Sequence, residues 1–149
     1  MGEGAFWDVS LALGLDSLSD GRGFVAFDFD HDGDNDILVS NSSAPAQLFV
    51  NRWADRLDNH WLKVRLEGAG GLQPFGATVR VHAGGRVEAR SYSLGTAYAS
   101  SHAGPLLFGL GAADRVERVE VLWPGGARTE IEAPAIDREL TLVHPGKTP

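Results

Sequence analysis

The chain has 149 residues, 43% of them hydrophobic, and carries a formal net charge of −7. This length allows one domain with a buried core, or one domain with an appendage. The acidity is uneven, because residues 1–58 hold eleven acidic and three basic residues whereas residues 59–149 hold nine and ten. A nucleic-acid partner is not expected, since phosphate binding requires a basic face. The negative charge concentrated in residues 1–58 instead favours a cation as the binding partner.

Cysteine is absent from the sequence, which excludes disulfide bonds and thiolate metal sites. No stretch approaches the roughly 20 apolar residues that a membrane-spanning helix requires, so we expect no membrane span. The first residues, Met1-Gly2-Glu3-Gly4, lack the basic and apolar regions of a secretory signal. We therefore expect that a signal peptide is absent from this chain.

The first part of the chain contains short β-type runs. Residues 6–18 have a mixed apolar pattern, which we interpret as an edge strand and loop. Three runs then predict a small antiparallel meander, at residues 24–28, 37–40 and 47–51. Residues 52–59 are mostly polar and charged and have no β-branched side chain. We place a domain boundary there, between segments 1–58 and 59–149.

The second part alternates more regularly. Apolar residues at positions 62, 64 and 66 alternate with charged residues at 63, 65 and 67, as in a half-buried strand. Further strand-like runs, separated by Gly and Pro turns, are Thr78–His82, Val87–Ser93, Leu106–Leu110, Val116–Trp123, Ala127–Ile131 and Glu139–Val143. Trp61 and Trp123 lie in these patterns and are expected to pack in the core or at turns. The pattern predicts an all-β fold, an antiparallel β-sandwich preceded by a single β-meander.

The most specific motif is a nine-residue loop with aspartate at alternate positions. Asp28, Asp30 and Asp32 occupy positions one, three and five, Gly33 allows a sharp turn at six, Asp34 offers its backbone carbonyl at seven, and Asp36 is at nine. Calcium takes six to eight oxygen ligands at ~2.3–2.6 Å, which such a loop converges on one point. The sequence therefore predicts a Ca²⁺ site formed by these five aspartates.

A solvated acidic turn and a magnesium site are the two alternatives to a calcium site. A solvated acidic turn is disfavoured, because five carboxylates in nine residues repel one another and oppose folding unless a cation is bound. Magnesium is a weaker candidate, since it retains its waters and rarely uses so many carboxylates. Position twelve is Val39, where a helix–loop–helix calcium site carries a glutamate. The loop is thus a strand-flanked variant in which Asp36 supplies the late carboxylate.

Residues Gly23–Asn41 resemble an FG-GAP/VCBS repeat, the calcium-loop blade of integrin-like β-propellers. The following segment is similar to the ASPIC/UnbV domain of the cartilage acidic protein family, through the motifs Asn59–Leu66, Gly76–Val81, Tyr98–Ser101, Leu107–Gly111 and Val121–Gly126. These resemblances imply a calcium-stabilised interaction module that is secreted or located at the cell surface. Because one blade cannot close a propeller, the chain is expected to be the last blade and following domain of a longer protein, or a reduced form.

Two functional classes remain open. The first is a non-catalytic module that binds an extracellular polysaccharide, matrix or protein surface, as in cell adhesion or carbohydrate binding. The second is an accessory enzyme of the kind that the family's presence in natural-product gene clusters implies. The Ser100-Ser101-His102 run does not form a catalytic pair by adjacency alone, since neighbouring strand residues point to opposite faces. Trp53, Tyr92 and Tyr98 are candidate sugar-stacking aromatics. We favour binding over catalysis.

Overall fold

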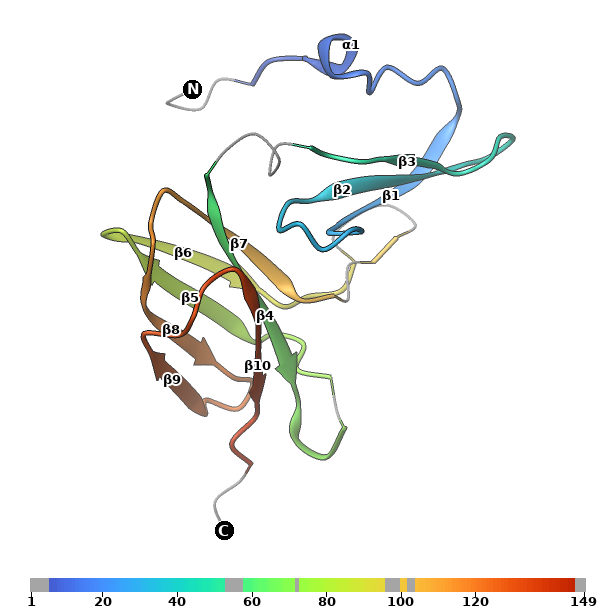
Figure 1. Cartoon of the computed structure of the whole chain (residues 1–149). Helices are drawn as coiled ribbons and strands as arrows, with labels where there is room; N and C mark the ends of the chain where they lie inside the picture. The colour runs from blue at the N-terminus through green and yellow to red at the C-terminus, as the bar shows by residue number, and fades with distance from the viewer. Residues whose placement is uncertain (1–5, 53–57, 72, 96–99, 102–103, 147–149) are drawn as a thin grey trace.

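The computed structural model describes residues 6–52, 58–71, 73–95, 100–101 and 104–146, which form three β-sheets (Figure 1). In chain order the elements are α1 (Ser10–Leu13), β1 (Gly21–Phe27), β2 (Asp36–Asn41), β3 (Gln47–Phe49), β4 (His60–Glu67), a 3₁₀ turn (Ala69–Gly71), β5 (Thr78–Ala83), β6 (Arg86–Ser91), β7 (Leu106–Gly111), β8 (Val116–Leu122), β9 (Arg128–Glu132) and β10 (Arg138–Val143). The predicted strands are confirmed, with boundaries shifted by a few residues.

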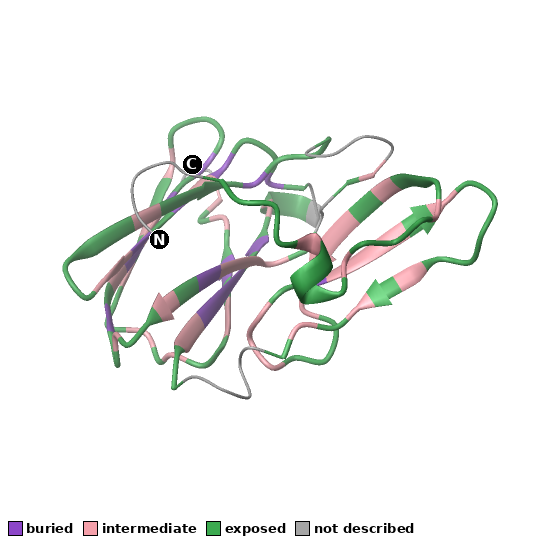
Figure 2. Cartoon of the chain, turned by 90° about the horizontal axis from the view of Figure 1, so that it is seen from above, coloured by how far each residue is buried: buried purple, intermediate pink, exposed green. Residues whose placement is uncertain are grey.

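Strands β1, β2 and β3 form the predicted antiparallel meander. Phe27 pairs with Asp36, so the hairpin closes at the two ends of the aspartate-rich loop. Apolar residues lie on both faces of this sheet, and Phe24 and Leu48 are 49% and 38% exposed. In Figure 2 the sheet is pink and green, with little of the purple that marks buried residues. The meander thus has little core of its own.

The other two sheets pack face to face as a sandwich. One has the strand order β10-β4-β7 and the other β6-β5-β8-β9. They share a core that draws on both sheets: Leu62, Val64, Leu66, Phe108 and Leu142 from the first, and Val79, Val81, Val116, Val119 and Val121 from the second. The predicted all-β sandwich is therefore confirmed. Because these core residues all lie within 59–149, that segment contains the principal core.

One strand pairing differs from the expected antiparallel arrangement. Strand β10 runs parallel to β4, from Arg138 opposite Leu62 to Val143 opposite Glu67. Strand β10 follows β9 of the other sheet, so no tight hairpin joins it to β4 and the antiparallel direction that a hairpin imposes does not apply. The sandwich is consequently mixed, with its parallel pair beside the antiparallel pair β4–β7.

The expected edge strand within residues 6–18 is also wrong, because this segment contains the helical turn α1. The Asp8 carboxylate accepts hydrogen bonds from the backbone N–H and hydroxyl of Ser10, at 3.0 and 2.7 Å. Such local bonds compete with strand pairing. Gly14 ends the turn in the left-handed conformation, at φ 70°. None of the helices in the described ranges has the length and apolar character needed to cross a membrane.

Candidate metal centre

The loop between β1 and β2 brings three carboxylates together. One oxygen from each of Asp28, Asp30 and Asp36 lies within 4.8 Å of the others. Oxygens bound at ~2.3–2.6 Å to a single calcium ion have separations in this range. We call these three residues the Asp cluster, and residues 28–36 the Asp loop. The cluster joins both ends of the loop, because Asp28 follows β1 and Asp36 begins β2.

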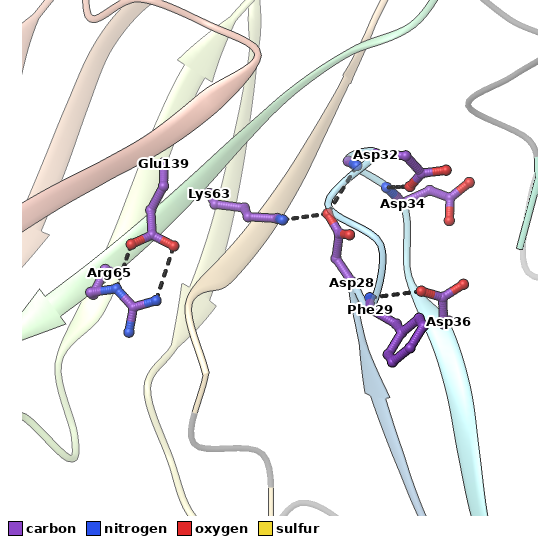
Figure 3. Close-up of polar contacts among 9 residues, drawn as sticks. Asp28, Phe29, Asp32, Asp34, Asp36, Lys63, Arg65 and Glu139 are labelled. Carbon is purple, nitrogen blue, oxygen red and sulfur yellow. Dashed lines mark hydrogen bonds and ion pairs between the residues drawn. The ribbon is translucent and has the colours of Figure 1, made fainter. Parts of the chain in front are cut away.

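Asp36 is the fully buried member of the Asp cluster, with 0% of its surface exposed. Its Oδ2 accepts the backbone N–H of Phe29 at 2.7 Å (Figure 3), and its Oδ1 accepts the backbone N–H of Asn51 at 2.7 Å. These bonds hold the start of the loop and the chain after β3 against β2. Each carboxylate oxygen has a further lone pair that a cation can use.

The two carboxylate oxygens of Asp28 differ in their contacts. Its Oδ2 accepts the backbone N–H of Gly33 at 2.9 Å and forms an ion pair with the Lys63 ammonium of β4 (Figure 3). Its Oδ1 is buried and has no hydrogen-bond partner in the described part of the chain. A buried carboxylate oxygen without a partner carries an unmet desolvation cost. This atom is the strongest sign that the loop accommodates a ligand.

Asp32 and Asp34 are not part of the three-carboxylate group that the described residues form. Asp32 Oδ1 instead accepts the backbone N–H of Asp34 at 3.0 Å. The pKa of Asp32 is raised, first because burial disfavours the charged form and then because of the neighbouring Asp34, Asp30 and Asp28 charges; the hydrogen bond from Asp34 acts in the opposite direction. The metal roles of Asp32 and of the Asp34 carbonyl therefore stay predictions.

Lys63 is the site residue that sequence reasoning missed. The alternation places it on the charged face of β4, which we expected to be solvated, but only 7% of its surface is exposed. Its ammonium lies 4.9 Å from the centre of the Trp61 ring as well as against Asp28. The signal available in the sequence was Trp61, an aromatic residue two positions away on the same face, which indicates that this face is covered.

Gly33 marks the point where the Asp loop contacts the sandwich. Its φ is 96°, and a Cβ at this position would overlap the Cδ1, Nε1 and Cε2 atoms of Trp61. Both the left-handed backbone and the close approach therefore require glycine. The predicted sharp turn at position six is present. Because glycine has no side chain, it also allows the loop backbone to pack directly on the Trp61 ring.

A cleft of about 440 Å³ lies beside the loop, between β1 and the sandwich, and its lining includes Asp28, His31, Lys63, Arg65 and Glu139. Arg65 holds Glu139 through two hydrogen bonds, one of them 3.0 Å from Nη2 to Oε2 (Figure 3). The bond from Arg65 keeps the pKa of Glu139 below its ordinary value despite partial burial. Asp28 and Lys63, like Arg65 and Glu139, are thus held in ion pairs.

The remaining candidates for catalysis or sugar binding are Ser100 and Tyr92, which have structural contacts, and three residues that lie outside the described part of the chain. The Ser100 hydroxyl donates a hydrogen bond to the carbonyl of Phe24 at 2.7 Å. Tyr92, a candidate sugar-stacking residue, is only 6% exposed and packs in the core, so that interpretation is wrong. Trp53, Tyr98 and His102 lie outside the described residues.

A family model described as "ASPIC and UnbV" matches residues 70–149, which is more than half of the chain. No curated protein matches the chain. The match supports the resemblance to the ASPIC/UnbV domain, and the Asp loop lies outside it. ASPIC/UnbV domains are associated with extracellular proteins. The chain belongs to the ASPIC/UnbV family.

Proposed function

We propose that the chain is a calcium-binding, non-catalytic interaction module of a secreted or cell-surface protein, and that the Asp loop is its metal site. The observation that carries this proposal is the buried, unpartnered Oδ1 of Asp28 beside two further carboxylates within 4.8 Å. A divalent cation would satisfy that atom and reduce the repulsion among the loop carboxylates, which adds to the effect of burial in raising the pKa of Asp32. Calcium is preferred over magnesium because it accepts many carboxylate ligands and flexible geometry.

The proposed ligands are the carboxylates of Asp28, Asp30, Asp32 and Asp36 and the backbone carbonyl of Asp34, with water at the remaining positions. Asp28 and Asp36 are already held by backbone N–H groups, which fixes part of the site in advance. Asp30 is exposed and has freedom to complete the shell. The metal would join the ends of β1 and β2.

The Asp segment is proposed to be one FG-GAP/VCBS-like blade of a larger assembly. The half-exposed apolar residues on both faces of β1–β3 support this reading, because a blade packs against neighbours on both sides. The proposed partner is an extracellular polysaccharide, matrix or protein surface. The family's association with extracellular proteins supports that choice. No specific observation favours the accessory-enzyme alternative, since the charged groups at the cleft are held in ion pairs.

Calorimetric titration of the whole chain with calcium tests the metal site. We expect one calcium ion per chain, with uptake abolished or strongly weakened by the combined change Asp30→Ala and Asp32→Ala. Asp16→Ala is the matched control, because Asp16 is an exposed aspartate outside the loop. Absence of uptake by the unmodified chain, or equal uptake by all three proteins, would contradict the proposal. Binding to glycan and matrix-protein arrays, compared with calcium and with chelator, then tests the partner class.

A further inference from the structure

Lys63 carries a buried positive charge whose carboxylate partner is a proposed calcium ligand. Its side chain is 9% exposed and that of Asp28 is 3% exposed, so water screens the pair weakly. The ammonium also lies over the Trp61 ring, 4.9 Å from its centre. A lysine in this position supplies part of the positive charge that the Asp loop needs when no metal is bound.

Calcium and the Lys63 ammonium make opposing demands on Asp28. Calcium can bind through Oδ1 alone, but bidentate coordination would also require Oδ2, which the ammonium occupies. Even with Oδ1 alone, a divalent ion and an ammonium on one carboxylate repel each other strongly at low exposure. Metal binding is therefore opposed for as long as Lys63 stays in its place.

The structure offers Lys63 a second position. The adjoining cleft of about 440 Å³ is lined by both Lys63 and Glu139, so a displaced ammonium has space and a carboxylate close by. The charge of Lys63 already contributes to lowering the pKa of Glu139. A short movement of the Lys63 side chain would take its ammonium from Asp28 to Glu139, which already pairs with Arg65. The ammonium would then still lie beside a carboxylate and would not be buried without a counter-charge.

We propose that Lys63 is an intramolecular competitor of calcium at Asp28, so that metal binding releases this lysine from the Asp loop. The inference rests on the proposed calcium site and defines its regulation. Competition weakens the site, and extracellular calcium modules work in a weak range of about 10⁻⁴–10⁻³ M. The competition also couples metal binding to the packing of the meander on the sandwich, because the Lys63–Asp28 ion pair that calcium would break is one of the contacts between the Asp loop and β4.

The first test is a calcium titration of Lys63→Met, which keeps a flexible apolar stem over Trp61 and removes the charge. Arg80→Met is the control, because Arg80 is an exposed cation on β5. We expect Lys63→Met to bind calcium about tenfold more tightly, or better, than the unmodified chain at low salt. Arg80→Met should bind as the unmodified chain does. Unchanged or weaker binding by folded Lys63→Met would overturn the inference.

The second test uses the unmodified chain and does not depend on the folding of a variant. Lys63 and Lys147 are the only lysines in the sequence, so labelling lysine with ¹³C at the ε position gives two NMR signals. We expect calcium to shift the Lys63 signal and leave the Lys147 signal in place. Calcium uptake, measured on the same sample, with an unmoved Lys63 signal would overturn the competition and leave the calcium site intact. Absence of uptake would overturn both proposals.

Discussion

The ring of Trp61 on β4 lies against the backbone of Gly33 in the Asp loop, so closely that no side-chain atom fits between them. This packing contact and the Lys63–Asp28 ion pair connect the same loop to the same face of the same strand. The Asp loop is therefore part of the interface between the meander and the sandwich. Changes in the loop are expected to affect that interface.

Gly33→Ala should destabilise the chain more than a positive φ alone explains. Gly126 has a similar φ of 91° with open space around it, so Gly126→Ala measures the backbone cost by itself. The overlap with Trp61 should add about 1–3 kcal/mol to the loss of unfolding free energy. Urea unfolding of both variants gives the comparison. Equal losses in the two would show that Trp61 does not restrict this position.

Asp36→Asn should destabilise the chain before any metal is added. The buried carboxylate accepts N–H groups from Phe29 and Asn51, and the asparagine NH₂ group would face one of these donors. Leaving a buried donor unpaired costs about 1–3 kcal/mol. Asp30→Asn is the control, because Asp30 is exposed and should change metal-free stability little. Denaturant unfolding with chelator present measures both; similar stabilities would contradict the structural role of Asp36.

Calcium should stabilise the meander more than the sandwich. At 100 times the dissociation constant, mass action adds about 2.7 kcal/mol to the unfolding free energy, so the melting temperature should rise. Hydrogen exchange locates the effect: protection should increase around residues 24–51, with little change at 61–66 or 116–123. Equal slowing everywhere would indicate one cooperative unit. An unchanged pattern would mean that calcium does not order the loop.

The Arg65–Glu139 pair predicts a loss of stability in acid. Because Arg65 lowers the pKa of Glu139 in the folded state, the pair contributes fully above the ordinary glutamate pKa. That contribution disappears as the pH falls through the lowered folded-state value. Glu139→Gln should therefore give a shallower loss of stability below about pH 4.5. Glu117→Gln, an exposed control, should keep the slope of the unmodified chain; an unchanged slope in Glu139→Gln would refute the coupling.

Residues 59–149 should fold without the Asp segment, because the principal core lies entirely within them. Removing the meander would expose Trp61 and Lys63 to solvent, so the loss of stability would be confined to one face of β4. We expect dispersed amide signals in solution, with Trp61 fluorescence shifted to longer wavelength. An unfolded fragment would show that the meander completes the core of the sandwich.

The strands and the acidic loop were predictable because their signals are local. Alternation at residues 62–66 indicates burial of one strand face. The spacing of the five aspartates predicts carboxylates that converge in one loop, where the structure brings together those of Asp28, Asp30 and Asp36. The parallel β4–β10 pair was not predictable in this way, since a period of two is the same for parallel and antiparallel strands. In residues 6–18 the local bonds of Asp8 to Ser10 outweighed a weak strand pattern.

The part of the site that sequence reasoning missed depends on contacts between distant segments. Lys63 has the pattern of a solvated strand residue, and only the packing of the Asp loop on β4 turns it into a buried cation. The position of Asp36 also depends on a segment outside the loop. Asp36 is held by the N–H of Asn51, beyond β3, and that contact has no signature in the spacing of the loop.

The calcium site itself is tested most directly by long-wavelength anomalous diffraction from crystals of the whole chain grown with calcium. We expect a single anomalous peak at the loop, about 2.3–2.6 Å from oxygen atoms of Asp28, Asp30 and Asp36. The Lys63 ammonium should then lie away from Asp28 and toward Glu139. A map at saturating calcium without a peak at the Asp loop, and with Lys63 still paired to Asp28, would contradict the proposed metal site.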